Sequence, residues 1–262
     1  MSKTKESETS EAEDEYQLSV SLNVLNHLGL NLYSNVPAVL SEAVANAWDA
    51  DAENVNVNID KGEGRIEIID DGDGMNEEDV NNRYLNVGYR RRQDDERPNR
   101  TPKHDRPVMG RKGIGKLSLF SIAKTVEVYT RKDGEEHAFR MKVDEIEEAI
   151  EEDEKTHGRG ESIYIPTKLD RFPEDLDSGT KIVLKDLKKR VRTTESALRK
   201  RLARRFGVIG SEYNFNIWIN GEEVKVTDRD YFHKVQFLWT FGNEDYADYC
   251  RDSKLDKHKT RQ

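Results

Sequence analysis

Apolar residues recur at both helical and strand spacing along this chain, and the two kinds of segment follow each other in mixed order. Leucines at helical spacing predict an amphipathic helix over residues 16–32. A second predicted helix runs from Pro37, which a first helical turn tolerates, to about Ala50. Alternating apolar and polar residues then predict strands over residues 55–59 and 65–69, joined by a glycine-containing turn.

The middle of the chain continues this mixture around one long polar segment. Residues 76–87 are compatible with a short helix, and residues 114–123 with a buried helix that follows glycines. Residues 88–109 contain arginines and prolines but almost no apolar side chains. A polar segment of that length is either a functional lid or disordered. Residues 126–130 and 138–143 alternate as the two strands of a hairpin.

The remainder of the chain adds strands and a basic helix. The acidic residues 144–155 are expected to form a solvated helix face or a loop. Strands are predicted over residues 163–165, 181–184 and 214–220, the last ending in an Asn-Gly hairpin turn, and a basic helix over residues 193–206. Helices and mostly antiparallel strands in mixed order predict an α+β sandwich.

Composition narrows the classes of function. The chain has 262 residues, 34% of them hydrophobic and 36% charged, with a net charge of -9. This charge excludes a uniformly basic nucleic-acid coat, although local basic patches remain possible. No apolar run is long enough to cross a bilayer, and residues 1–14, nearly free of apolar side chains, predict a disordered acidic tail rather than a secretion signal. The single cysteine, Cys250, favours a reducing compartment, namely the cytoplasm, or the nucleus in a eukaryote. The six histidines lack metal-ligand spacing, so no zinc site is expected.

The first segment with candidate chemistry lies in the helix that begins at Pro37. At 100° per residue, Glu42, Asn46 and Asp49 share one face, opposite the apolar face. An amide oxygen suits Mg²⁺, and a carboxylate one turn away can polarise an attacking water. From this segment alone, the preferred interpretation is an ordinary amphipathic helix with a solvent-exposed polar face.

The second segment is an acidic, glycine-rich turn, Asp70-Asp71-Gly72-Asp73-Gly74-Met75, at the end of a predicted strand. Glycine lets the backbone approach a flat ligand closely. A carboxylate at the strand end can accept a hydrogen bond from an exocyclic amine, which would select adenine over guanine. A plain β-turn is the alternative, whereas an EF-hand calcium loop is excluded because its twelfth position would be Asn81 instead of a glutamate.

The third segment, Gly110 to Lys116, matches most of a Walker A loop. Position 117 is leucine, where the Mg²⁺-binding Ser or Thr should be, so a P-loop is not expected. A Gly-x-x-Gly-x-Gly loop before an apolar helix can instead hold phosphates with its backbone N–H groups, and Lys112 and Lys116 add positive charge. A flexible glycine linker is an equally good interpretation of this segment alone.

In this order, the three segments resemble the GHKL ATPase superfamily, which includes DNA gyrase B, the ninety-kilodalton heat-shock chaperone, histidine kinases, MutL and MORC proteins. The helix resembles the family's N box, and the two glycine segments resemble its two glycine boxes. Residues 178–183 are similar to its late Gly-Thr strand. The stretch from Gly110 to Leu117 is nearest to MORC-like or related prokaryotic members.

The resemblance implies a Bergerat fold, a two-layer sandwich in which helices cover one face of a mixed, mostly antiparallel sheet. The ATP-binding domain would span residues 15–190, with an ATP lid at residues 88–109. Residues 191–262 would begin a transducer-like or second region, and the chain is expected to be a fragment or an unusually short member.

The resemblance also implies a role for each matching residue. Glu42 would be the general base, Asn46 would bind Mg²⁺, Asp70 and Thr180 would hold adenine, and Asp49 would orient water or support the loop. The implied nucleotide-binding residues are Asn46, Asp49, Asp70, Gly72, Gly74, Met75, Gly110, Lys112, Gly113, Ile114, Gly115, Lys116 and Thr180.

The function that this resemblance implies is Mg²⁺-dependent ATP binding and slow hydrolysis, used as a conformational switch with ATP-dependent homodimerisation. The alternative is a nucleotide-gated module with negligible turnover that binds DNA or a protein client. The basic stretch from Arg199 to Arg205 motivates that alternative, although a solvated helix face is the preferred interpretation of it. A histidine kinase is a third hypothesis, disfavoured because such domains usually lack a carboxylate at the position of Glu42. No membrane partner is expected.

Overall fold

The computed structural model describes residues 18–21, 35–86, 99–110, 115–156, 161–188, 195–209, 213–229, 231–241, 250 and 257–261. The predicted tail at residues 1–14 therefore lies outside the described residues, as do residues 88–98 of the predicted lid. Lys112, Gly113 and Ile114 lie outside them as well.

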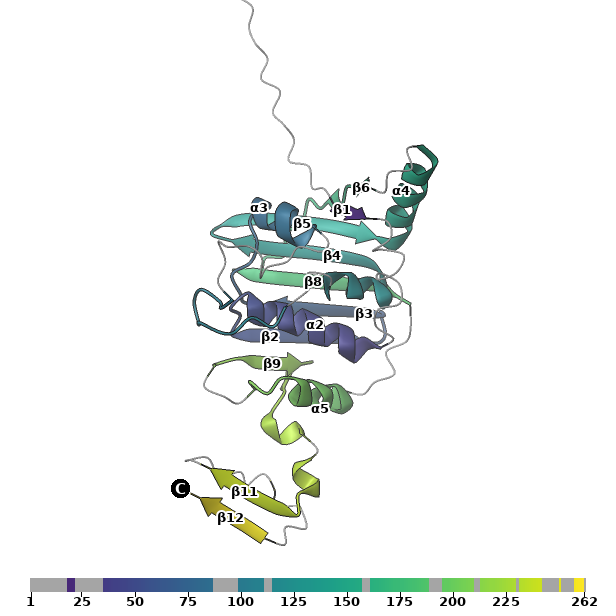
Figure 1. The fold of residues 1–262 in the computed structure, drawn as a ribbon. Helices are drawn as coiled ribbons and strands as arrows, with labels where there is room; N and C mark the ends of the chain where they lie inside the picture. Colours follow the sequence, from purple (N-terminus) through teal and green to yellow (C-terminus); the bar gives the residue numbers. More distant parts are fainter. Residues whose placement is uncertain are drawn as a thin grey trace, which may run out of the picture.

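The centre of the fold is an eight-stranded sheet in the order β10-β9-β2-β3-β8-β4-β5-β7 (Figure 1). Neighbouring strands are antiparallel except β2 and β9, which are parallel. The mixed, mostly antiparallel sheet predicted from the sequence is thus confirmed. The strands are β2 (Asn54–Asp60), β3 (Arg65–Asp70), β4 (Ala123–Lys132), β5 (Glu135–Lys142), β7 (Thr167–Lys168), β8 (Gly179–Leu187), β9 (Asn216–Ile219) and β10 (Glu222–Glu223).

Helices α2 and α5 lie across one face of this sheet, which gives the two layers expected of the fold (Figure 1). The buried helix predicted over residues 114–123 is a 3₁₀ helix, η4, and the chain enters β4 directly after it. The helical segments are α2 (Val36–Asp49), α3 (Glu77–Asp79), the π-helical turn η2 (Val80–Tyr84), η4 (Gly115–Ser121), α4 (Val143–Thr156), α5 (Glu195–Arg205) and the 3₁₀ turns η5 (Val226–Asp228) and η6 (Phe232–Lys234).

Helix α2 forms because its local signals agree with its packing. The side chain of Asn35 caps it by accepting the backbone N–H of Ala38 at 3.0 Å, and Pro37 occupies the first turn. Its apolar face, which includes the fully buried Leu40 and Trp48, packs into the core. The opposite face is left for the polar residues, as the periodicity predicts.

The first predicted helix, over residues 16–32, is wrong at Leu18–Ser21. These residues form strand β1, which pairs antiparallel with β6 (Glu161–Tyr164) in a small separate sheet. In this stretch Leu and Val alternate with Ser, so the sequence also fits a strand. A partner strand about 140 residues away in the chain decides between the two periods, because its ladder supplies the backbone hydrogen bonds.

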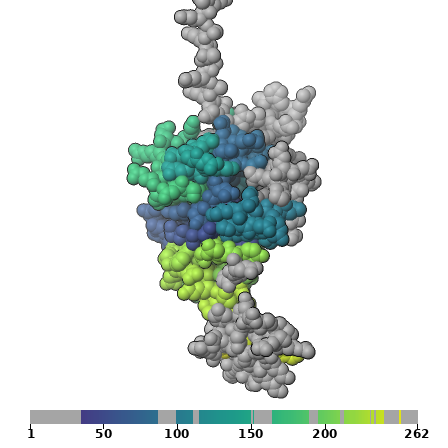
Figure 2. Space-filling view, turned by 90° about the vertical axis from the view of Figure 1, so that its left-hand side faces the viewer, coloured from purple at the N-terminus to yellow at the C-terminus, as the bar shows by residue number. Residues whose placement is uncertain are grey.

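The sheet continues past residue 190, where the sequence suggests that a second region begins. Strand β9 pairs with β2 at the register Val55–Ile217, and α5 packs beside α2. In Figure 2 the green atoms of this part adjoin the blue body of the domain. A separate parallel pair, β11 (Phe237–Phe241) with β12 (Lys257–Arg261), lies beyond it.

Candidate functional site

The polar face of α2 presents Glu42 and Asn46 one helical turn apart. Glu42 is partly exposed and Asn46 is exposed. The side-chain amide of Asn46 has no hydrogen-bond partner among the described residues. An exposed amide oxygen beside a carboxylate is compatible with the Mg²⁺ and water-activating roles that the resemblance implies.

Asp49, in the last turn of α2, is buried and supports the second glycine segment. Its two carboxylate oxygens accept the backbone N–H groups of Met109 and Gly110, each at 2.7 Å. A carboxylate with two such bonds is held in place by the loop. Of the two roles that the resemblance leaves open for Asp49, this geometry favours support of the loop.

Both ends of the second glycine segment lie against carboxylates of α2. A Cβ atom on Gly110 would meet Oδ2 of Asp49 at 2.7 Å, and one on Gly115 would meet Oε2 of Glu42 at 2.9 Å. These approaches are too close for a side chain. A side chain at either position would displace one of these carboxylates, and the loop between the two glycines begins and ends beside the polar face of α2.

The two residues predicted to bind adenine lie opposite each other on neighbouring strands. Asp70, the last residue of β3, is paired with Thr180 near the start of β8. Burial raises the pKa of the Asp70 carboxyl to about 7, although the backbone N–H groups of Gly72 and Thr180 donate to it and act in the opposite direction. The pairing of β3 with β8 brings a partly buried acid and a hydroxyl to one point at the edge of the first glycine turn.

That turn is packed against both α2 and the sheet. Gly72 is buried, and a Cβ atom there would meet the carbonyl oxygen of Ala50 at 2.6 Å. The N–H of Met75 donates at 2.8 Å to the hydroxyl of Thr130, which in turn donates to the carbonyl of Gly179 at 3.1 Å. Thr130 is fully buried and joins the glycine turn to the Gly-Thr strand. Nothing in the sequence singles it out, because it looks like any other residue of β4.

The conformation of this turn predicts a large difference between two glycine substitutions. Gly74 and Gly64 have similar positive φ angles, 66° and 62°. A Cβ on Gly74 would approach the carbonyl oxygen of Arg131 to 2.1 Å, whereas nothing lies within 4 Å of a Cβ on Gly64. Gly74→Ala is expected to lower the free energy of unfolding by about 2–4 kcal/mol and Gly64→Ala by only about 1 kcal/mol, measured by urea denaturation. Equal losses would show that the close approach carries no cost.

Lys116 follows the second glycine segment but is directed toward another part of the chain. Its ammonium donates to the carbonyl oxygens of Arg83 at 2.8 Å and Asn86 at 2.7 Å. Burial lowers its pKa to about 7. In this conformation Lys116 donates hydrogen bonds to carbonyl oxygens at the end of η2 and just after it. Its role in phosphate binding stays a prediction.

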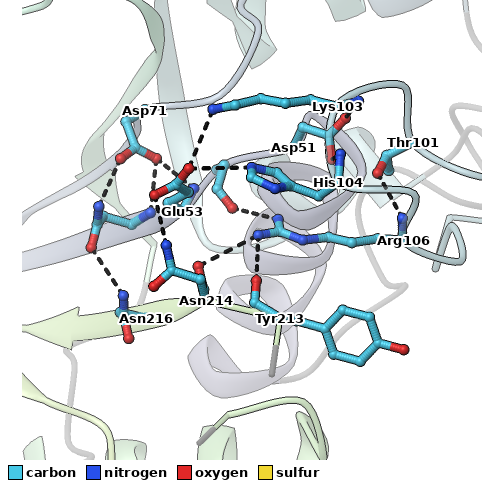
Figure 3. Close-up of polar contacts among 12 residues, drawn as sticks. Asp51, Glu53, Asp71, Thr101, Lys103, His104, Arg106, Tyr213, Asn214 and Asn216 are labelled. Carbon is cyan, nitrogen blue, oxygen red and sulfur yellow. Dashed lines mark hydrogen bonds and ion pairs between the residues drawn. The ribbon is translucent and has the colours of Figure 1, made fainter. Parts of the chain in front are cut away.

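A buried arginine, Arg106, joins residues 99–110 to two other parts of the chain, the residues that follow α2 and those that precede β9 (Figure 3). Its side chain is fully buried and donates to the carbonyl oxygens of Ala52 at 2.5 Å and Tyr213 at 2.8 Å. The guanidinium also lies 4.7 Å from the ring centroid of Trp48, a cation–π contact. Burial lowers its pKa, and the carboxylates of Asp51, Glu53 and Asp71 oppose that shift.

The last turn of α2 and the residues that follow it also hold residues 99–110 through other hydrogen bonds. The indole N–H of Trp48 donates to the carbonyl of Pro107 at 2.9 Å. The carboxylate of Asp51 accepts the backbone N–H groups of Lys103 at 2.8 Å and His104 at 3.2 Å. Residues 99–110 are therefore packed onto the domain, and this part of the predicted lid is not a free flap.

Glu42 has one further partner, which comes from α5. The Nη2 group of Arg205 donates to Oε1 of Glu42 at 2.7 Å. The side chain of Arg205 is 50% exposed and that of Glu42 is 23% exposed, so water still reaches the pair. The sequence offers no signal for this contact, because the two residues lie 163 positions apart.

The structure thus brings all the described parts of the three predicted segments around one helix. The N–H of Asp73, in the first glycine turn, donates to the carbonyl of Ala50 at 2.8 Å, and the second glycine segment contacts Asp49 and Glu42. The glycines let both segments lie close to α2, and Asn46 beside Glu42 presents an exposed amide, so the residues present fit ATP with Mg²⁺. A separate open pocket of about 460 Å³, lined in part by Lys61 and Asn220, contains none of these residues.

Comparison with known proteins agrees with this arrangement. Residues 33–165 match the family described as "Histidine kinase-, DNA gyrase B-, and HSP90-like ATPase". The chain is 43% identical over 229 residues to the "Putative type II restriction enzyme HgiDII" of Herpetosiphon aurantiacus, a match that covers 87% of this chain. It is also 29% identical to the chaperone protein HtpG of Sulfurovum sp. and 31% identical to HtpG of Rickettsia prowazekii, each over 57% of this chain.

These matches cover only part of the relatives. The matched region is 35% of the length of the Herpetosiphon protein and 27% and 28% of the two HtpG proteins. Among the described residues, no helix has the length and apolar character needed to span a membrane. The placement near MORC proteins stays a prediction. The family match spans half of the chain and includes the helix and both glycine segments that form the site, and this protein therefore belongs to the histidine kinase-, DNA gyrase B- and HSP90-like (GHKL) ATPases.

Proposed function

We propose that this protein binds ATP with Mg²⁺ and hydrolyses it slowly, and that the bound nucleotide acts as a conformational switch. The observation that carries the proposal is the contact of α2 with both glycine segments. Asp49 holds Gly110, and Ala50 accepts the N–H of Asp73. A nucleotide with its base near Asp70 and its phosphates near Gly115 would span the polar face of α2.

In this proposal each residue has a defined task. Asp70 accepts a hydrogen bond from the adenine amine, with Thr180 beside it, and Asn46 supplies an oxygen ligand for Mg²⁺. When bound, Mg²⁺ neutralises phosphate charge that the protein would otherwise have to balance. Glu42 takes a proton from water as the water oxygen attacks the γ-phosphorus and the bond to the ADP oxygen breaks.

The switch would act through the loop that ends at Gly110. Asp49 holds Gly110 and Met109, and Arg106, a few residues earlier, reaches the carbonyl of Tyr213 just before β9. These hydrogen bonds connect the second glycine segment, which would hold the phosphates, to the C-terminal part of the described chain. ATP-dependent homodimerisation belongs to the same proposal.

Calorimetry tests the binding step. A non-hydrolysable ATP analogue with Mg²⁺ is expected to bind with about 1:1 stoichiometry, and the GTP analogue to bind much more weakly because Asp70 selects the adenine amine. Release of inorganic phosphate from ATP is expected to need Mg²⁺. Binding that does not distinguish the two bases would contradict the role of Asp70.

The raised pKa of Asp70 predicts how stability depends on pH without nucleotide. The carboxyl has a pKa of 3.8 in an unfolded chain and about 7 in the fold, so the folded state retains the proton more strongly between these values. Stability therefore falls as the pH rises from about 4 to about 7 and levels off above that range. Asp70→Asn lacks this titration, so its stability relative to wild type is expected to increase across the same window, measured by urea unfolding at each pH. Parallel profiles for the two proteins would contradict the prediction.

A second candidate function is a nucleotide-gated module that binds nucleic acid. The exposed basic side chains of α5, such as Arg204, favour it, and the Herpetosiphon relative is named as a restriction enzyme. Because contacts to phosphates release counterions, binding to duplex DNA would weaken steeply as the salt concentration rises. Affinity for DNA that does not change with salt would exclude phosphate contacts by this helix.

A further inference from the structure

We propose that Arg205 is a positioning residue for Glu42, and this inference rests on the proposed function of Glu42 as the general base. The geometry shows an asymmetric carboxylate. Oε1 of Glu42 accepts a hydrogen bond from Nη2 of Arg205 at 2.7 Å. Oε2 lies on the side of Gly115, 2.9 Å from the place where a Cβ of that residue would be.

This arrangement divides the tasks of the two carboxylate oxygens. One oxygen is held by the guanidinium of Arg205, while the other is directed to the end of the second glycine segment. A general base must be held within hydrogen-bond reach of the water whose proton it takes, and a misplacement of about 1 Å can cost about 10²-fold in rate. Arg205 therefore acts through Glu42, by fixing which oxygen faces the loop.

The position of Arg205 is itself well supported. It is the last residue of α5, whose Leu198, Leu202 and Ala203 are buried in the core. The buried face of the helix anchors its last turn, which is also the end where the helix dipole favours a cation. Arg205 lies outside residues 33–165, the part of the chain that the family match covers. The contact thus belongs to the segment that follows the ATP-binding motifs.

A series of variants tests this role. Arg205→Ala is expected to lower kcat for ATP hydrolysis by about tenfold, with KM and the calorimetric affinity for a non-hydrolysable analogue unchanged within about twofold. Arg205→Lys, which retains one donor group, is expected to restore most of the lost rate. In a Glu42→Gln background, Arg205→Ala is expected to cause no further loss, because its effect passes through that carboxylate.

Arg201→Ala is the matched control. Arg201 is an exposed arginine on the same helix, one turn before Arg205, so its removal lowers the charge of α5 by the same amount. The kcat of Arg201→Ala for ATP hydrolysis is expected to equal that of wild type. The retained nucleotide affinity of each variant also reports that the domain is folded.

Three results would overturn the inference, and they can be told apart. If wild type hydrolyses ATP and Arg205→Ala is as fast as Arg201→Ala, or faster than wild type, then Arg205 does not position the base. If Arg205→Ala and Arg205→Lys lose nucleotide affinity together with rate, the residue is structural or binds the nucleotide. If wild type itself releases no phosphate from ATP, the hydrolytic function fails and the role of Arg205 fails with it.

Discussion

Glu42→Gln is expected to lower kcat for ATP hydrolysis by about 10²–10⁴-fold, the usual contribution of a positioned general base. The amide has nearly the same shape as the carboxylate and still offers an oxygen to Arg205. It cannot, however, take a proton from the attacking water. Phosphate release from ATP under saturating Mg²⁺ measures the loss directly.

Nucleotide binding separates this chemical effect from damage to the site. The affinity of Glu42→Gln for a non-hydrolysable ATP analogue is expected to stay within a few-fold of wild type, because the residues assigned to adenine and to Mg²⁺ are unchanged. Glu63→Gln, at an exposed glutamate in the β2–β3 turn, is the control and should retain the full rate. A loss smaller than about tenfold in Glu42→Gln would show that another group activates the water.

Arg106→Ala is expected to lower the free energy of unfolding by about 3–5 kcal/mol. The substitution removes the cation–π contact with Trp48 and leaves the buried carbonyl of Ala52 and the partly buried carbonyl of Tyr213 without this donor. It also removes the favourable charge interaction of the guanidinium with the carboxylates of Asp51 and Glu53. Urea denaturation of wild type and variant measures the difference.

An exposed arginine in the same loop provides the comparison. Arg100 forms an ion pair with Asp105 at 3.0 Å, and its side chain is 57% exposed. Arg100→Ala is expected to cost less than about 1 kcal/mol, because water and salt screen such pairs. Similar losses for Arg100→Ala and Arg106→Ala would contradict the importance of burial for Arg106.

Arg106 also shows why the loop before Gly110 was difficult to interpret from sequence. Residues 88–109 are polar, and polar segments of that length are ordinarily lids or disordered. In the structure, residues 99–110 are held by polar contacts: Trp48 binds Pro107, and Asp51 binds Lys103 and His104. These hydrogen bonds to the end of a helix add to the burial of Val108, and hydropathy does not reveal them.

Much of the fold followed from local pattern. Helix α2 has its cap at Asn35, its proline in the first turn and its apolar face where the periodicity places them. Strands β2 and β3 and the hairpin of β4 and β5 also agree with their alternation of apolar and polar residues. In contrast, strand β1 was not predicted, because its pairing with β6 depends on residues that are distant in sequence.

Patterns of neighbouring residues are enough to predict the polar face of α2, the two glycine segments and the order of the three motifs along the chain. Which distant groups meet depends on the tertiary structure. Arg106 and Tyr213 are 107 positions apart, and Arg205 and Glu42 are 163 positions apart. Periodicity and capping act within a few residues, whereas these contacts arise only after the sheet has placed β9 beside β2 and α5 beside α2.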